Sequence, residues 1–257
     1  MVMQTVKGAA RAQLQMTRHE IEDLTPLITM PLFTLVLMAI IIHSGRRELS
    51  GYAVIAPMLI TLAQMGIFVA SEMVTRERGL QTLELLVASP APFFLIIVPR
   101  IVMITTLGLV GFAESWLLAR IVFDVNVVIE HPFVFAATVA VTIAAGTGTA
   151  LIAAALICFA RSTRTFQAAV AYPLFLISGV LVPVSYLPDW LEPFSRAVYL
   201  YWSADLLRDS LLAVPPDDVL WRLGAMALLG LVAGILGACL INRMLVHLKR
   251  EGTLGLA

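Results

Sequence analysis

The segment SEMVTRERGLQTLELLVASP, residues 71–90, contains the residues whose types and spacing best suit chemistry with a partner. Glycine interrupts a helix and proline ends one, so Gly79 and Pro90 predict a short helix over residues 81–88. The apolar side of this segment consists of Leu80, Leu83 and Val87, and its acidic side of Glu77, Gln81 and Glu84. Such a helix could dock in a groove of a soluble partner, or the segment could merely turn the chain around; the spacing alone leaves both interpretations open.

The other reactive side chains predict neither an enzyme nor a metal site. The four histidines are scattered without HExxH or similar spacing, and GTGT at residues 146–149 is not the GxSxG motif of a nucleophile. The two cysteines lie in apolar stretches and form no CxxC pattern. A P-loop requires GxxxxGK[ST], and neither Lys7 nor Lys249 lies in such a motif. The chain is therefore not expected to hydrolyse ATP itself.

The elements that must position the charged segment are apolar helices. Hydrophobic residues make up 60% of the 257 residues and charged residues only 13%, far from the balance of a soluble protein. Runs close to the ~20 residues needed to cross a bilayer as helix occur six times. These runs cover residues 24–45, 49–75, 101–122, 132–160, 165–188 and 223–242. The sequence thus predicts an all-α polytopic membrane protein with six transmembrane helices.

Basic residues near the ends of the predicted spans indicate the orientation. With the N-terminus inside, eleven Lys and Arg residues fall on the cytoplasmic side and six outside, so both termini are expected in the cytoplasm. Residues 1–23 place an apolar face beside a basic edge, which favours a helix lying in the membrane interface over a solvated lead-in helix. The excess of Arg over Lys suits a bacterial source, and we expect the bacterial plasma membrane.

Two stretches of the sequence resemble ABC-2 type (type V) ABC transporter permeases. The first is similar to the coupling region of these permeases and contains Arg76, Glu77, Arg78, Gly79, Thr82, Leu83, Glu84, Leu85, Leu86, Ser89 and Pro90. The second, SGVLVPVSYLPDWL at residues 178–191, is followed by a segment ending in Leu-Arg at residues 207–208. In the family this second stretch forms short external helices that dip back into the outer leaflet.

The resemblance implies one transmembrane domain over residues 1–257, with a cytoplasmic coupling helix between spans two and three and external re-entrant helices over residues 183–218. It implies two copies of an ABC ATPase, which would bind the ATP and Mg that this chain does not, and a second permease subunit, identical or paralogous. The lipid bilayer is the other partner, and no nucleic acid is expected. Contacts with the ATPase are implied for Arg76, Glu77, Arg78, Gly79, Gln81, Thr82, Leu83 and Glu84.

The family pattern also implies a translocation path between membrane subunits, lined largely by spans one, two and five. The residues expected on this path are Met30, Phe33, Tyr172 and Phe175, with Glu114 as a further candidate. A carboxylate in the third span should avoid lipid, and we favour a structural hydrogen bond for Glu114 over contact with cargo. In the external region the matching residues are Pro183, Leu187, Pro188, Trp190 and Arg208.

Several alternatives remain after these steps. The small residues of GTGTA at 146–150 and of the GxxxG spacing at 230–234 could pack within one chain or between chains. Arg100 is expected to anchor its helix at the inner leaflet by extending its charge toward the headgroups. We expect an exporter of a small amphiphilic or lipid-like compound of the drug or antibiotic type. Export of a lipid-linked polysaccharide and a secondary transporter outside the ABC class are the alternatives.

Overall fold

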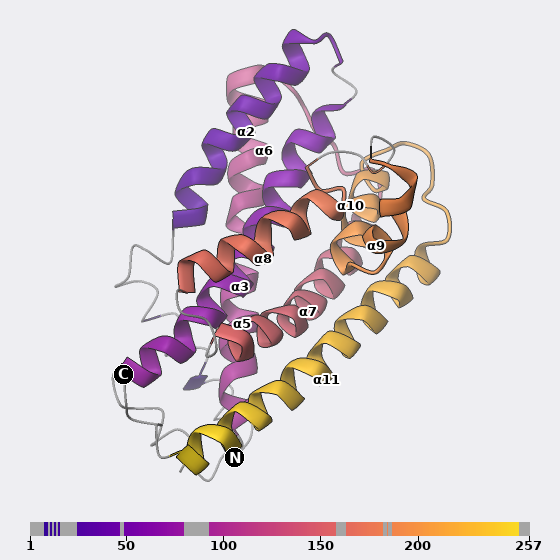
Figure 1. Ribbon diagram of the computed structural model, residues 1–257. Helices are drawn as coiled ribbons and strands as arrows, with labels where there is room; N and C mark the ends of the chain where they lie inside the picture. Colours follow the sequence, from indigo (N-terminus) through magenta and orange to yellow (C-terminus); the bar gives the residue numbers. More distant parts are fainter. Residues whose placement is uncertain are drawn as a thin grey trace.

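The structure is a computed structural model that describes residues 8–9, 11, 13, 15, 25–46, 49–79, 93–157, 163–181, 184 and 187–251. All regular secondary structure in these residues is helical (Figure 1). The helices are α2 (Thr25–His43), α3 (Ser50–Gly79), α5 (Phe93–Leu107), α6 (Val110–Phe123), α7 (Pro132–Ile157), α8 (Thr163–Ile177), the 3-10 helix η4 (Asp189–Leu191), α9 (Glu192–Arg196), α10 (Tyr199–Asp209) and α11 (Val219–Glu251). This confirms the all-α architecture.

Five helical stretches of the described chain are long and apolar enough to cross a membrane. A helix satisfies its backbone hydrogen bonds internally, which is why long apolar sequences in lipid fold this way. The five stretches are Thr25–His43, Ser50–Met73, Phe94–Phe123, Pro132–Ile157 and Val219–Met244. They correspond to the expected spans one, two, three, four and six.

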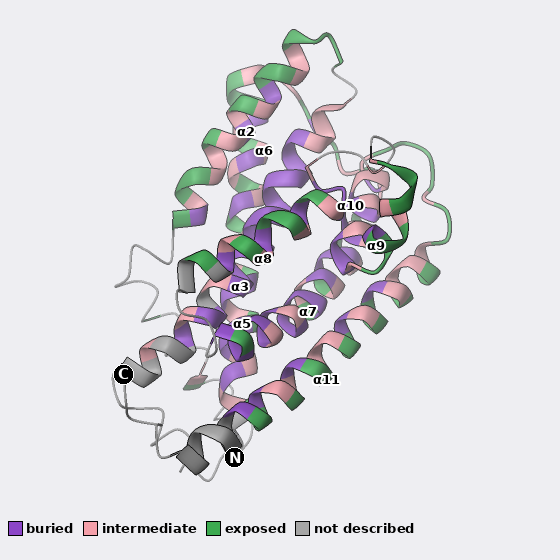
Figure 2. Cartoon of the chain, viewed as in Figure 1, coloured by how far each residue is buried: buried purple, intermediate pink, exposed green. Residues whose placement is uncertain are grey.

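Helix α3 is the centre of the bundle. In its apolar stretch 94% of the residues are buried, against 17% in α2 and 28% in α11. Helices α2, α5, α6, α7, α8 and α10 all pack on α3, and α11 lies along α7 on the outside. Figure 2 shows the same contrast, because α3 is coloured as buried along most of its length while α2 and α11 carry exposed residues along one side. The exposed sides of α2 and α11 suit contact with lipid.

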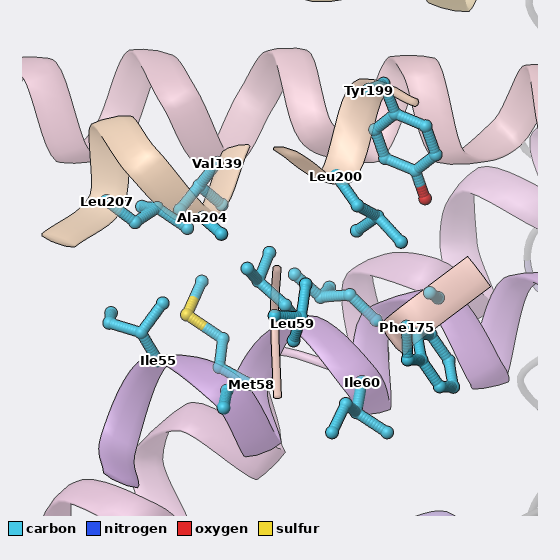
Figure 3. Close-up of a cluster of buried hydrophobic side chains, with 14 of the residues drawn as sticks. Ile55, Met58, Leu59, Ile60, Val139, Phe175, Tyr199, Leu200, Ala204 and Leu207 are labelled. Atoms are coloured by element: carbon cyan, nitrogen blue, oxygen red, sulfur yellow. The ribbon is translucent and has the colours of Figure 1, made fainter. Parts of the chain in front are cut away.

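The largest core cluster joins α3 to α7, α8 and α10 (Figure 3). Met58 and Leu59 of α3 are fully buried there, as is Leu200 of α10. Phe175 brings α8 into the same cluster with only 2% of its surface exposed. The short helix α10 is therefore packed into the bundle and is not a free external loop.

The expected fifth span is shorter than the apolar run that predicted it. Helix α8 ends at Ile177 and not at Pro188, because Gly179 adopts a left-handed conformation with φ of 72°. The carbonyl oxygens of Gly179 and Val180 accept hydrogen bonds from Arg208 Nη2 at 3.0 and 2.8 Å. Arg208 thus satisfies backbone groups that a continued helix would have paired, and α8 alone does not have the length of a regular span.

The third span begins earlier than expected and is broken in the middle. Helices α5 and α6 form one apolar stretch interrupted at Gly108 and Leu109, where the amides bond back over three residues to Thr105 and Thr106. A Cβ on Gly108 would lie 3.0 Å from Leu62 Cα, so this bend brings the chain close against α3.

The expectation that Arg100 extends its charge toward the headgroups is wrong, because its side chain is buried. Its side chain is only 7% exposed and lies within α5, where its Nε donates a hydrogen bond of 2.9 Å to Gln13 Oε1. A buried guanidinium with a polar partner can lie inside a helix, so the third span continues past a charge that was expected to bound it.

The small residues of α7 and α11 pack against each other within one chain. A Cβ built on Gly230 would lie 2.5 Å from Ala145 Cα, and one on Gly237 would lie 2.6 Å from Leu151 Cβ. The alternative in which the GxxxG spacing packs within the subunit is therefore the one observed. The glycines allow α7 and α11 to approach backbone to backbone.

Candidate functional site

A cavity of about 820 Å³ lies over α3, between α2 and α8. Helices α2 and α8 each pack on α3, so α3 forms the floor of the cavity and the other two helices form its walls. The lining residues are Thr25, Pro26, Thr29, Met30, Phe33, Ile60, Gln64, Met65, Phe68, Glu72, Gln167, Ala168, Tyr172, Phe175 and Leu181. The volume is in the range of drug-sized ligand sites.

Four of the residues expected on a translocation path meet in this cavity. Met30 and Phe33 come from α2, while Tyr172 and Phe175 come from α8. Phe175 is also part of the core, whereas Tyr172 is 64% exposed, so the α8 wall extends from the core to the surface of the chain. Residues separated by about 140 positions thus face one space, although the sequence placed them there only through the family pattern.

Glu114 does not line the cavity. It lies on α6, which packs against α2 and α3, and it is half-buried. Its Oε2 atom is buried and has no hydrogen-bond partner in the described part of the chain. Glu114 thus lies apart from the four other expected path residues, and its Oε2 does not make the structural hydrogen bond that we favoured with any described residue.

Polar residues of α3 and α8 are the part of the site that the sequence reasoning missed. Gln64 and Gln167 both line the cavity and are 8% and 3% exposed. Gln167 Nε2 donates to the backbone carbonyl of Phe68 at 3.2 Å and so links α8 to α3. Amides within predicted spans are a signal in themselves, since polar groups are costly in lipid and usually face the protein interior.

Two hydroxyl groups connect α2 to α6. Thr34 Oγ1 and Ser115 Oγ are hydrogen-bonded to each other at 2.9 Å in a buried contact between α2 and α6. One of the two hydroxyls donates to the other, and the hydroxyl that accepts is free to donate to a carbonyl one turn earlier in its own helix, Met30 for Thr34 or Gly111 for Ser115. This contact joins α2 to α6 one turn beyond the cavity residue Met30.

One end of the cavity meets the charged segment at the end of α3. Glu72 lines the cavity and pairs with Arg76 one turn later, with 3.4 Å between Oε2 and Nη2. Burial lowers the pKa of Arg76, and the neighbouring charge of Arg100 lowers it further. The predicted coupling residues Glu77, Arg78 and Gly79 continue the same helix, which ends at Gly79.

The rest of the expected coupling helix, with Gln81, Thr82, Leu83 and Glu84, lies outside the described residues. Of the expected interfacial helix over residues 1–23, only positions 8, 9, 11, 13 and 15 are described, and these are helical.

The segment from the end of α8 to α10, which was expected to be external, is organised around Arg208. Its guanidinium lies 3.9 Å from the centre of the Tyr52 ring, in addition to its bonds to the end of α8, and burial lowers its pKa. Leu187 and Arg208 line a second hollow of about 360 Å³. Pro188 precedes η4, in which Trp190 is exposed, and Pro183 lies outside the described residues.

Helix α10 is tied to α11 and α7 by polar contacts. Arg222 of α11 forms ion pairs with Asp205, at 3.2 Å, and with Asp209. Thr142 of α7 donates to Ser203 of α10 at 3.0 Å. These contacts fix α10 over the core.

Comparison with known proteins agrees with this architecture. The comparison with curated proteins gives no match. The family model described as ABC-2 type transporter matches residues 3–212, a range that contains both walls and the floor of the cavity as well as Arg208. Because this match covers most of the chain, the protein belongs to the ABC-2 type transporter family.

Proposed function

We propose that the chain is the membrane-spanning permease subunit of an ATP-driven exporter, which moves a small amphiphilic or lipid-like compound out of the cytoplasm or the inner leaflet. The observation that carries this proposal is the cavity between α2, α3 and α8, on which the four expected path residues converge. The lining of the cavity is largely apolar and includes Phe33, Phe68 and Phe175. Such walls suit the body of an amphiphile better than a sugar chain, which needs many hydrogen-bonding groups along its length.

The proposed topology has six crossings with both termini in the cytoplasm of a bacterial cell. The five long apolar helices supply five crossings, and α8 with the segment that follows it supplies the remaining one. In this orientation the cavity opens in the cytoplasmic half, since Thr25 begins α2 and Glu72 lies near the end of α3. The proposed re-entrant helices are η4, α9 and α10, since each is too short to cross a bilayer.

The work is proposed to come from a separate pair of ABC ATPase subunits that act on two permease subunits. Helix α3 is suited to transmit the movement of the ATPases to the cavity, because one continuous helix contains both the cavity residue Glu72 and the charged residues from Arg76 to Arg78. Closure of the ATPases around ATP would push on the segment after α3, and α3 would move as a rigid element of the wall.

The test is co-purification of the tagged chain from its native membranes in a mild detergent, with mass spectrometry and an ATPase assay. We expect an ATP-binding cassette subunit to co-elute with the wild-type chain. The variant Glu77→Ala/Glu84→Ala should insert normally but lose that subunit or its activity. The matched control is Glu130→Ala/Glu192→Ala, which removes two carboxylates from the opposite side in the proposed topology.

A chain that purifies alone, in a detergent shown to preserve such complexes, would contradict the ATP-driven assignment. Equal loss of the ATPase in both double variants would contradict the placement of the docking contact.

A further inference from the structure

Gln64 is a buried amide whose hydrogen-bonding capacity is not used by the protein. It lies in the middle of the apolar stretch of α3, lines the cavity and is only 8% exposed. The structure records no hydrogen bond to its side chain from the described residues, in contrast to the other buried glutamine of the cavity. The amide therefore faces the cavity with its donor and acceptor groups open to whatever fills that space, and a molecule that displaces water there must replace the hydrogen bonds that water makes.

Other polar side chains around the cavity have partners in the described part of the chain, except Tyr172, which is 64% exposed. Thr29 Oγ1 donates to the carbonyl of Thr25 at 3.0 Å, and Gln167 Nε2 donates to the carbonyl of Phe68. The carboxylate of Glu72 is paired with Arg76. Gln64 is therefore the deep polar group available to a bound molecule, and it presents both a donor and an acceptor.

The surroundings of Gln64 define the rest of that molecule. Phe68 lies one helical turn from Gln64 on the same side of α3, and both line the cavity. Met30 and Phe33 supply the opposite wall and Phe175 the inner one. An apolar or aromatic body can pack on these side chains while a single polar end reaches Gln64.

We infer that Gln64 selects uncharged amphiphiles whose polar end both donates and accepts hydrogen bonds, such as a primary amide or an alcohol. This inference rests on the proposed function, since it names the class of cargo for the same cavity. A cationic amphiphile is disfavoured because Glu72, the carboxylate of the cavity wall, is already neutralised by Arg76. An amide in the wall offers no net charge to attract one.

The experiment measures binding to the purified protein in lipid nanodiscs, with binding to protein-free nanodiscs subtracted. Three fluorescent probes share one apolar body: pyrenebutanamide, butylpyrene and pyrenebutyl-trimethylammonium. The wild-type protein should bind the amide most tightly. In Gln64→Leu and in Gln64→Met the affinity for the amide should fall roughly tenfold, the effect of losing about one good hydrogen bond, and the affinity for butylpyrene should stay the same.

Thr106→Val is the matched control, because it removes a hydroxyl that is already paired within α5, to the carbonyl of Val102, and that does not line the cavity. It should leave the affinities of all three probes unchanged. Thermal stability separates recognition from a structural role. If Gln64 serves a ligand, Gln64→Leu should be as stable as the ligand-free wild type or more so, whereas a structural role would lower its melting temperature.

Unchanged affinity of the amide in both Gln64 variants would overturn the inference, as would tightest binding of the trimethylammonium probe. Binding is measured without ATP turnover, so the result does not depend on the ATPase partner. Gln64-dependent binding by a chain that recruits no ATPase would retain this inference and contradict the proposed function. A co-eluting ATPase together with binding that does not depend on Gln64 would retain the proposed function and contradict this inference.

Discussion

Gly148 of α7 and Gly230 of α11 lie so close that a Cβ added to Gly148 would come within 2.5 Å of the Gly230 carbonyl oxygen. Gly234 forms the other side of this contact, with its backbone nitrogen 2.8 Å from the same position. No side chain larger than hydrogen fits there without moving one helix. In lipid, helices associate through such close packing because the hydrophobic effect does not drive them together.

Alanine at these glycines should destabilise the protein. We expect Gly148→Ala and Gly230→Ala each to lower the free energy of unfolding by about 1–3 kcal/mol, the usual effect of overpacking. The measurement is unfolding in mixed detergent micelles followed by circular dichroism. Gly224→Ala is the control on the same helix, since a Cβ there meets nothing within 4 Å. Equal stability of Gly230→Ala and Gly224→Ala would contradict the close contact.

Arg208 should stabilise the packing of α10 against the end of α8. In Arg208→Met the carbonyls of Gly179 and Val180 lose their donor and Tyr52 loses its cation, so we expect a loss of about 2–4 kcal/mol. Arg208→Lys should recover only part of it, because an ammonium lacks the fork of the guanidinium. Chemical denaturation monitored by tryptophan fluorescence measures the change.

Arg196→Met is the control for Arg208, because Arg196 forms an exposed ion pair with Glu192 on the neighbouring helix. It should alter stability little. If Arg208→Met proved as harmless as Arg196→Met, the contacts at the end of α8 would have no measurable effect.

The Thr34–Ser115 contact between α2 and α6 should show measurable coupling. Each hydroxyl keeps a bond to its own helix when the other is removed, so Thr34→Val and Ser115→Ala should each have modest effects. A double-mutant cycle should give a coupling energy of about 0.5–1.5 kcal/mol. Thr138→Val replaces Thr34→Val in the control cycle, because the Thr138 hydroxyl bonds only within α7. Coupling indistinguishable between the two cycles would contradict the contact.

The sequence predicted the helices well where length and apolarity decide the structure. The first, second, fourth and sixth spans fall on the apolar runs that predicted them. The run after residue 164 failed as a guide to helix length, because the turn at Gly179 depends on Arg208, which lies 29 residues further on. Arg100 was misplaced for the same reason, since its partner Gln13 is distant in sequence.

The candidate site was only partly predictable. Met30, Phe33, Tyr172 and Phe175 were named from the family pattern, and the structure brings them to one cavity. Gln64 and Gln167 were not named, although each is an amide within an apolar run. Hydropathy averages conceal a single polar residue, and only the packing of α2 and α8 on α3 shows that both amides face the same space.

Met30 and Ile28 of α2 should differ in their access to water. Met30 lines the cavity, whereas Ile28 is 62% exposed on another face of the helix, which the proposed topology turns toward lipid. In a background with Cys158→Ser and Cys239→Ser, we expect Met30→Cys to react with a water-soluble maleimide in inside-out vesicles. Ile28→Cys should react more slowly by on the order of tenfold, because the reactive thiolate is disfavoured in lipid.

Leu59→Cys calibrates this measurement as a fully buried position that should react only after denaturation. Similar rates for Met30→Cys and Ile28→Cys would show that water reaches the cavity no better than it reaches the opposite face of α2. The translocation path would then have to lie elsewhere. Fast reaction at Met30→Cys that slows when pyrenebutanamide is added would connect the water-filled cavity with the site at Gln64, since both residues line the same space.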